Sequence, residues 1–180
     1  MADNHSLPSL PSIPEYIAYD LAHDIEVYVA GQAAQLRGPE VTPLIEKAHE
    51  LAVRAYGEDW LHWGFSGLPL AGEQIAGHAE ATIEVLRVIG WNPSDSARRS
   101  IRDGLFLARS TEAGWGDDTS WRIGDLLNIL IRASTGAPSA FYESWDMHPS
   151  RIVGDVYAIL AAAAAYARRY GLADAVQLRG

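Results

Sequence analysis

One stripe of apolar residues recurs every four positions over residues 14–36 and consists of Ile17, Leu21, Ile25 and Val29. This interval places the four side chains on one face of an amphipathic helix. The helix ends before Gly38-Pro39, because glycine and proline interrupt helical structure. A second helix begins after Thr42, which can cap it, with Pro43 in its first turn, and it ends at Gly57.

The same periodicity predicts four more helices and a short helical turn. We expect helices over 72–89, from 94–96 through Ala108, from Asp118 or Thr119 through Thr135, and over 150–170, with the turn at 139–142. No segment alternates polar and apolar residues for long enough to predict a strand. The chain is therefore predicted to be all-α, as a single compact domain of six or seven helices.

The last predicted helix contains five consecutive alanines at 161–165 and stops at Gly171. Alanine favours helix and adds little bulk, so another backbone can approach this segment closely. We therefore expect this helix to lie at the centre of the domain or at the interface of a homodimer.

The first residues differ from the rest because a proline stands at every third position, as Pro8, Pro11 and Pro14. Proline lacks the backbone N–H and fixes φ, so this spacing favours an extended, polyproline-like conformation. We expect residues 1–13 to form a flexible arm that lies across the domain or docks onto a partner. Residues 14–180 would then form the helical domain.

Charge and composition narrow the classes of partner. With 14 basic and 23 acidic residues the formal net charge is −9, which disfavours generic nucleic-acid binding. We interpret a local basic strip, made of Arg98, Arg99, Arg102 and Arg109, as a solvated helix face. The chain has no cysteine, and it shows neither a signal peptide nor an unbroken apolar span. We expect a cytoplasmic protein without membrane contact or bound cofactor.

One candidate site is built from acid–base residues. The sequence contains no phosphate-binding glycine motif, nucleophile elbow or zinc-binding His-Glu-x-x-His helix. His62 lies between Trp60 and Trp63 in segment 58–71, an aromatic, glycine-rich loop whose three aromatic side chains we expect to avoid water. Together with Asp117 and Asp146, His62 forms the predicted catalytic set.

The loop tryptophans suggest a pocket beside these residues. The predicted ligand-binding residues are Trp60, Trp63, Trp91, Trp115, Trp145 and Arg151. An aromatic pocket with a few polar groups suits a small molecule or a partner's side chain. Packing at the rim of the core is the structural alternative for the tryptophans.

A metal centre is a different interpretation of the histidines. Glu46 precedes His49 by three residues, as Asp20 precedes His23, so each pair shares a helix face. His23, Glu46 and His49, with His78 on another helix, would form a set able to chelate iron, manganese or zinc. Ordinary surface pairs explain the same spacing.

From about Ala81 onward the order of motifs resembles a family of small actinobacterial and actinophage proteins of unknown function. The matching segments are 83–91, 104–108 and the run from Trp145 through Arg151 into Asp155-Val156. In that family the last run reads Trp-Asn-Asp, three variable residues and Arg-Thr, whereas Asp146, Met147 and Ile152 stand here in place of Asn, Asp and Thr. The resemblance implies a helical fold and a bacterial or phage origin, and it supplies no catalytic residues.

Three functions are compatible with these patterns. The first is a non-enzymatic accessory or binding protein that engages a protein partner or small ligand through the aromatic loops, and the lack of a complete catalytic constellation favours it. The second is a small-molecule enzyme with acid–base residues in a tryptophan-lined pocket. The third is a metalloprotein built from histidines and carboxylates.

Overall fold

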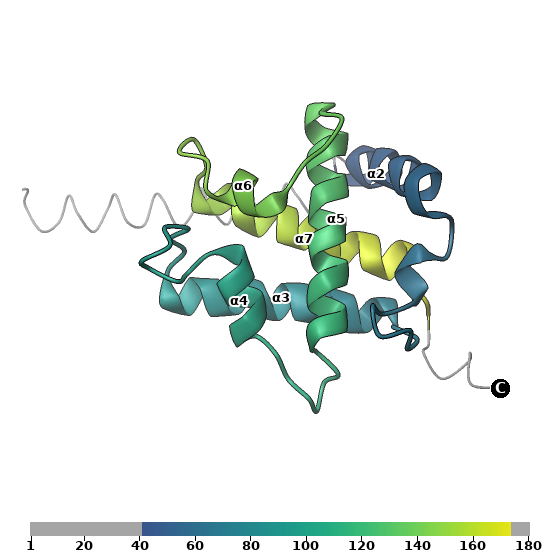
Figure 1. Ribbon diagram of the computed structural model, residues 1–180, viewed down its shortest axis with the longest axis horizontal. Coiled ribbons are helices and arrows are strands. Elements are labelled where there is room, and N and C mark those ends of the chain that lie inside the picture. Colours follow the sequence, from purple (N-terminus) through teal and green to yellow (C-terminus); the bar gives the residue numbers. More distant parts are fainter. Residues whose placement is uncertain (1–40, 174–180) are drawn as a thin grey trace, which may run out of the picture.

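The computed structural model describes residues 41–173, and in this range it is entirely helical apart from loops and isolated bridges. Its helices are α2 (Val41–Tyr56), α3 (Gly72–Ile89), α4 (Ile101–Leu107), α5 (Asp117–Thr135), α6 (Tyr142–Asp146) and α7 (Val153–Tyr170), with a 3-10 turn, η1 (Trp60–His62) (Figure 1). The prediction of a single all-α domain is confirmed for these residues. The predicted arm and the helix over 14–36 lie outside them.

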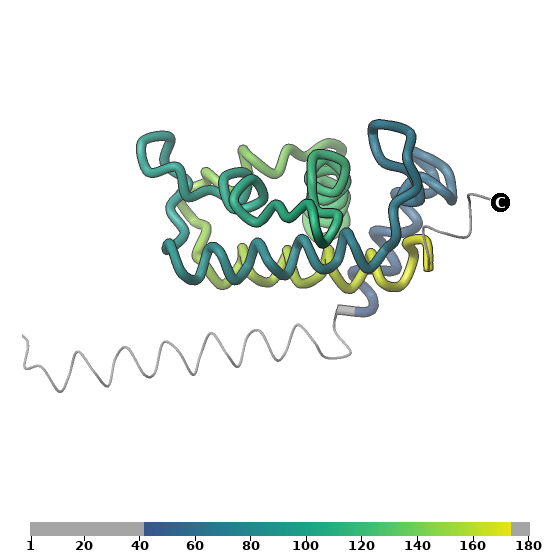
Figure 2. Tube along the Cα trace, turned by 90° about the horizontal axis from the view of Figure 1, so that it is seen from below, coloured from purple at the N-terminus to yellow at the C-terminus, as the bar shows by residue number. Residues whose placement is uncertain are grey.

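Two layers make up the domain. Helices α3 and α7 run side by side and form the most extensive helix–helix contact. Helix α5 crosses both of them from the second layer, which also contains α4, and α2 packs on α5 and α7 (Figures 1 and 2). Within residues 41–173, no helix combines the length and apolarity needed to cross a membrane.

The centre of the fold is the contact between α7 and its neighbours. Three residues of the alanine run, Ala162, Ala163 and Ala164, are buried, as is Ala167 one turn later. Gly72 opens α3 where α7 ends, and a Cβ atom there would lie 2.2 Å from the Ala167 carbonyl oxygen. Small residues therefore set the distance between the two helices, which places α7 centrally as predicted.

Ion pairs join the C-terminal end of α7 to α3 and α2 at the surface. The Arg168 guanidinium of α7 donates to both oxygens of Glu73, at 2.8 and 2.9 Å, and to both oxygens of Glu80, at 2.6 and 2.9 Å. Arg169 donates to Glu46 of α2 at 2.9 Å. Bidentate arginine–carboxylate geometry fixes orientation as well as charge, so α7 is held in register with α3.

Helix α4 begins later than predicted, at Ile101 rather than at 94–96. Ser100 caps it, because its hydroxyl accepts from the Asp103 N–H at 3.2 Å while Asp103 accepts from the Ser100 N–H at 3.0 Å. The preceding loop instead folds back on itself, and the Asn92 N–H donates to the Arg99 carbonyl at 2.9 Å. A side-chain cap thus determines where the helix starts.

Helix α3 begins at Gly72 as predicted, whereas the starts of α5, α6 and α7 also differ from the predictions. Gly116 rather than Asp118 or Thr119 is the N-cap of α5, and Asp118 instead accepts a hydrogen bond from the Ser66 N–H at 2.8 Å. The helical turn expected at 139–142 lies at α6, where the Asn128 side chain accepts from the Tyr142 N–H at 2.7 Å. Helix α7 begins at Val153 rather than at 150. Helix α5 is capped locally, because the Gly116 N–H donates to the Thr119 hydroxyl at 2.9 Å, whereas at α6 the hydrogen bond comes from a residue 14 positions away.

Segment 58–71 is ordered, but only one of its three aromatic side chains is buried. Trp60 is 8% exposed, whereas Trp63 is 41% and Phe65 81% exposed. The prediction that all three avoid water is therefore wrong. Phe65 lies instead against Trp121 of α5, with ring centroids 5.9 Å apart, so this loop contributes an exposed aromatic surface.

Candidate binding site

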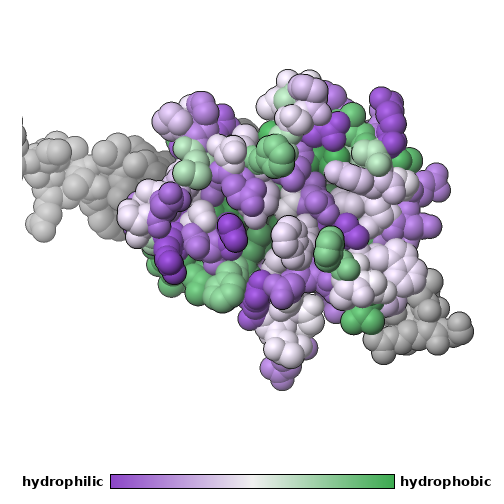
Figure 3. Space-filling model, in the orientation of Figure 1, coloured by the Kyte–Doolittle hydropathy of each residue, from purple (hydrophilic) through white to green (hydrophobic). Residues whose placement is uncertain are grey.

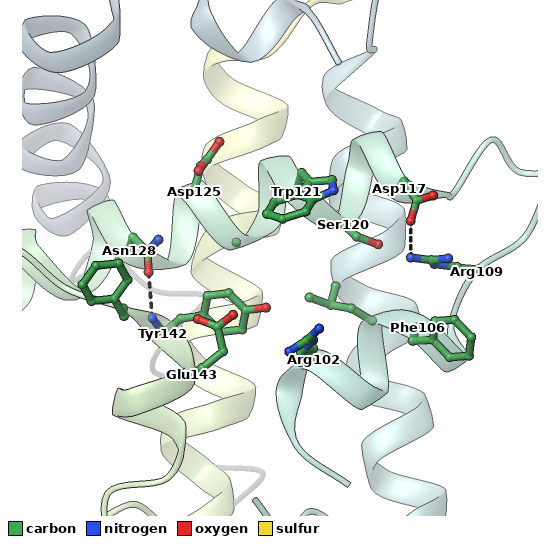
Figure 4. A pocket seen from close by; sticks show the side chains of 13 residues that line it. Arg102, Phe106, Arg109, Asp117, Ser120, Trp121, Asp125, Asn128, Tyr142 and Glu143 are labelled. Carbon is green, nitrogen blue, oxygen red and sulfur yellow. Dashed lines mark hydrogen bonds and ion pairs between the residues drawn. The ribbon is translucent and has the colours of Figure 1, made fainter. Parts of the chain in front are cut away.

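A cleft of about 580 Å³ lies between α4, α5 and the start of α6 (Figure 4). Its lining residues are Arg102, Leu105, Phe106, Arg109, Asp117, Ser120, Trp121, Gly124, Asp125, Asn128, Phe141, Tyr142 and Glu143. The size falls in the range of ligand-binding pockets. In Figure 3, hydrophobic residues are visible in a hollow beside α5, among the hydrophilic ones that surround it.

Helix α5 forms one wall because its lining residues share a helix face. Asp117, Ser120, Gly124 and Asn128 follow one another at intervals of three or four. A Cβ atom on Gly124 would lie 3.1 Å from Cε1 of Tyr142, so the glycine lets the Tyr142 ring approach α5 closely. The ring thereby forms the opposite wall of the cleft (Figure 4).

Aromatic side chains at the rim are largely exposed. Phe106 and Trp121 are each 62% exposed, and Phe141 is 68% exposed. Phe65 extends this surface through its stacking on Trp121. Several large aromatic rings left in water around one cleft indicate an interaction surface, because the same rings would stabilise the fold if they were buried.

Most charged groups of the cleft have partners. Arg109 forms an ion pair with Asp117 and lies over the Phe106 ring, 4.8 Å from its centroid. Asp125 accepts from Arg122 at 3.1 Å, and burial raises the pKa of this carboxyl against the opposing effect of Arg122. Arg102 differs, because it forms no ion pair with any residue of 41–173.

The Tyr142 hydroxyl is held protonated. Burial raises its pKa far above the ordinary value, and the nearby Glu143 carboxylate adds to the effect as a negative charge and a hydrogen-bond acceptor. The hydroxyl therefore acts as a hydrogen-bond donor at neutral pH rather than as a base.

A second hollow, of about 470 Å³, lies on the other side of α4 and shares Arg102, Phe106 and Glu143 with the first. The same three side chains thus line both cavities. Arg98 lines the second hollow and has a φ of +51°, a left-handed conformation that is rare for a residue with a Cβ atom. Such local strain occurs preferentially at functional sites.

The predicted catalytic residues do not share one cavity. Asp117 lines the cleft, in its ion pair with Arg109. Asp146 lines the second hollow, and His62 lines neither of these two cavities and lies 3.2 Å from Asp59.

Asp146 is 1% exposed and connects three segments. One carboxylate oxygen accepts from the Trp91 indole N–H and the other from the Ile101 N–H, both at 2.8 Å. Burial raises the pKa of this carboxyl, while these two donors act in the opposite direction. Both oxygens are engaged in holding the start of α4 against α6, which is a structural arrangement.

The predicted ligand-binding tryptophans are dispersed, and none of the five lines the two cavities. Trp145 lies under the Arg151 guanidinium, 4.8 Å from ring centroid to Cζ, and Arg151 approaches Asp155 at 3.5 Å. Trp60 packs edge-on against Tyr166 at 6.3 Å between centroids. Trp115 stacks on His78 at 6.0 Å.

His78 is fully buried between α3, α4 and α5. Its Nε2 lies 2.9 Å from the Leu105 carbonyl oxygen and must donate to it, so in the neutral ring Nδ1 accepts from the Thr119 hydroxyl at 2.7 Å. Desolvation by burial lowers the pKa of the ring, and nearby Arg109 lowers it further, against the Leu105 hydrogen bond. His78 is therefore neutral at pH 7 and joins three helices.

No group of three or more metal-ligating side chains lies together within residues 41–173. Glu46 pairs with Arg169, while His49 lies 3.1 Å from the Tyr166 hydroxyl and stacks on Tyr170 at 3.7 Å between centroids. His23 lies outside the described residues. Glu46, His49 and His78 thus interact with other protein groups and do not gather into a metal site within residues 41–173.

The sequence interpretation missed the aromatic residues that define the cleft, namely Phe106, Trp121, Phe141 and Tyr142. A signal was available in two of them, because Phe106 and Trp121 lie off the apolar stripes of their helices. A large aromatic residue on the polar face of a helix indicates either a contact surface or a packing site, and only the structure distinguishes them.

Comparisons of this chain with protein-family models, with curated proteins and with solved structures found no match, so the site is interpreted from its own geometry.

Proposed function

We propose that this chain is a non-enzymatic binding protein and that the cleft between α4, α5 and α6 holds a segment of a partner protein. The observation that carries the proposal is the ring of exposed aromatic side chains, Phe106, Trp121 and Phe141, around a cleft of about 580 Å³. Aromatic residues in such positions provide most of the energy of many protein interfaces.

The chemistry of the lining favours binding over catalysis. No histidine lines the cleft, and the Ser120 hydroxyl already donates to the Gly116 carbonyl at 2.8 Å. A serine nucleophile needs an adjacent base to accept its proton. Three carboxylates line the cleft: Asp117 and Asp125 are each engaged with an arginine, and Glu143 accepts from the Tyr142 hydroxyl.

The shape favours a chain segment over a small molecule. Arg102 and Phe106 line both the cleft and the second hollow, and the aromatic rim extends to Phe65 on the neighbouring loop. Small-molecule sites enclose most of the ligand surface, whereas exposed rings beside two neighbouring hollows suit an extended segment with side chains that enter both.

Selection from a displayed library of random octapeptides tests this proposal. Wild-type protein is compared with the double variant Phe106→Ala/Trp121→Ala, and the matched control is Val88→Ala/Leu107→Ala, two exposed apolar residues outside the cleft. We expect enriched peptides to bind the cleft variant at least about tenfold more weakly than the wild type and the control. Failure to enrich any peptide, or equal binding to all three proteins, would contradict the proposal.

A further inference from the structure

The four arginines in and around α4 fall into two kinds. Arg99 donates to the Ile89 carbonyl at 2.9 Å, and Arg109 forms the ion pair described above. Arg98 and Arg102 form neither an ion pair nor a hydrogen bond with any residue of 41–173. Both line the second hollow, and Arg102 lines the cleft as well. Two unused guanidinium groups, with five N–H donors each, therefore lie at one cavity.

The carboxylates that line the second hollow are mostly engaged. Asp103 accepts from the Ser100 N–H at 3.0 Å and from the Ser100 hydroxyl at 2.6 Å. Both oxygens of Asp146 are used as described above, and Glu143 accepts from the neighbouring tyrosine hydroxyl. Only Asp95, which is exposed, has no such partner within residues 41–173. The hollow thus has spare donors while most of its acceptors are used, which favours a ligand that supplies an acceptor.

Arg102 connects this pair of donors with the aromatic cleft. Figure 4 shows its guanidinium beside Tyr142 and Glu143. Its positive charge acts on the Tyr142 hydroxyl and lowers the pKa of this group against the larger effect of burial. Phe106, one turn further along α4, lines both cavities. In an extended segment the side chains on one face recur roughly every 7 Å, so a residue held against Phe106 has a neighbour within reach of Arg102.

We infer, on the basis of the proposed function, that the partner segment is acidic as well as apolar. An aromatic or aliphatic side chain enters the cleft, and an aspartate or glutamate carboxylate binds Arg98 and Arg102 in the second hollow. The planar guanidinium matches a carboxylate in bidentate geometry, and such charge-assisted hydrogen bonds are roughly twice as strong as neutral ones. The carboxylate thus provides specificity, while the aromatic rings provide most of the affinity.

A carboxylate suits this hollow better than a phosphate does. Four carboxylates of the chain line the hollow, namely Asp95, Asp103, Glu143 and Asp146. A phosphate group with nearly two negative charges meets about twice the repulsion from them that a carboxylate meets. The net charge of −9 opposes any acidic partner at long range, but salt screens exposed charges beyond roughly 8 Å at physiological ionic strength. The two guanidinium groups therefore determine the local preference.

A double-mutant cycle tests the inference. Wild-type protein and Arg98→Gln/Arg102→Gln are each titrated with an octapeptide selected on the wild type and with the same octapeptide after its acidic residue is changed to the amide. We expect either change alone to weaken binding about tenfold, and the amide octapeptide to bind both proteins equally. The control is Arg54→Gln, because Arg54 is also exposed and without an ion pair in 41–173 but lines neither cavity. It should bind as the wild type does.

A second selection reverses the charge of the hollow. On Arg98→Glu/Arg102→Glu, we expect enriched octapeptides to carry lysine or arginine where those selected on the wild type carry the acidic residue. Enrichment of the same acidic residue on both proteins would contradict the inference.

Three further results would overturn the inference while leaving the proposed function intact. The first is that octapeptides bind through Phe106 and Trp121 without any acidic residue. The second is that the cycle shows no coupling between the acidic residue and the two arginines. The third is that phosphoserine at the acidic position binds more tightly through Arg98 and Arg102, which would assign the hollow to phosphate. If no octapeptide depends on Phe106 and Trp121, the proposed function itself fails.

Discussion

The α3–α7 contact and the α4–α5–α6 cleft differ in the size of their residues and in the pairing of their charges. Along α3 and α7, small residues bring backbones together, and Arg168 shares its charge between Glu73 and Glu80. Around the cleft, large rings face water and Arg102 has no ion-pair partner among residues 41–173. The first region maximises packing, while the second retains features that cost stability, which is the usual mark of a binding surface.

The largest expected effect concerns the helix contact. Gly72→Ala would place a methyl group 2.2 Å from the Ala167 carbonyl oxygen, so α3 and α7 must separate. We expect a loss of roughly 3 kcal/mol or more in the free energy of unfolding, measured by denaturant titration.

Gly154→Ala in α7 is the control, because its Cβ would meet only ordinary contacts at 3.7 Å. Alanine favours helix over glycine, so this variant should be neutral or about 0.5–1 kcal/mol more stable. Equal losses at both glycines would show that the α3–α7 contact is not as tight as described.

The next effect concerns the buried carboxylate between the two regions. Asp146→Asn keeps the shape but turns one acceptor into a donor, which then faces either the Trp91 indole N–H or the Ile101 N–H. We expect a loss of about 1–3 kcal/mol in the free energy of unfolding. Full stability together with lost octapeptide binding would instead identify Asp146 as part of the binding site.

Acidification should weaken the fold through His78. Its pKa is lowered in the folded state, so the unfolded chain binds the proton more readily, and stability falls as the pH drops below about 6.5 towards the folded pKa. The raised pKa values of Asp125 and Asp146 act in the opposite direction.

Comparison with His78→Gln isolates this contribution to the pH dependence. The free energy of unfolding is measured at pH 7 and pH 5 for both proteins and for the exposed control His148→Gln. The His78→Gln variant should lose less stability on acidification than the wild type and the control. An equal loss in all three proteins would contradict the buried neutral histidine.

The smallest expected effect concerns strain beside the cleft. Arg98 adopts a φ of +51°, which asparagine tolerates better than arginine does. Arg98→Asn should therefore raise the free energy of unfolding by about 0.5–1 kcal/mol.

Arg99→Asn is the neighbouring control, since it removes the hydrogen bond from Arg99 to the Ile89 carbonyl, 2.9 Å long, and should lower stability. A loss of stability in Arg98→Asn would show that the left-handed backbone is not strained.

Within residues 41–173 the sequence was sufficient to predict which segments are helical and which of their faces are buried, because the evidence for both is local. The stripe of Ile75, Ala79, Ile83 and Leu86 is buried as its period indicates, and Gly171 ends α7 as predicted. Helix starts were less predictable where distant residues determine them, as Asn128 does for α6. The sequence around the start of α6 contains no pattern that indicates a contact with Asn128.

The candidate site depended still more on tertiary structure. Six tryptophans suggested a shared pocket, but only Trp121 lines the cleft, and it was not among the predicted ligand-binding residues. Its significance comes from Gly124 and Tyr142, which bring α6 against α5. Residue type identified the aromatic chemistry, whereas the packing of three helices determined which ring faces the cleft.

The most direct test of the binding site is a comparison of the six tryptophan indole N–H resonances before and after addition of a selected octapeptide. The account predicts that the Trp121 signal shifts most, while the signal of Trp91, whose N–H donates to buried Asp146, stays in place. Shifts confined to Trp60 and Trp63, with Trp121 unchanged, would contradict it and assign binding to the loop around His62.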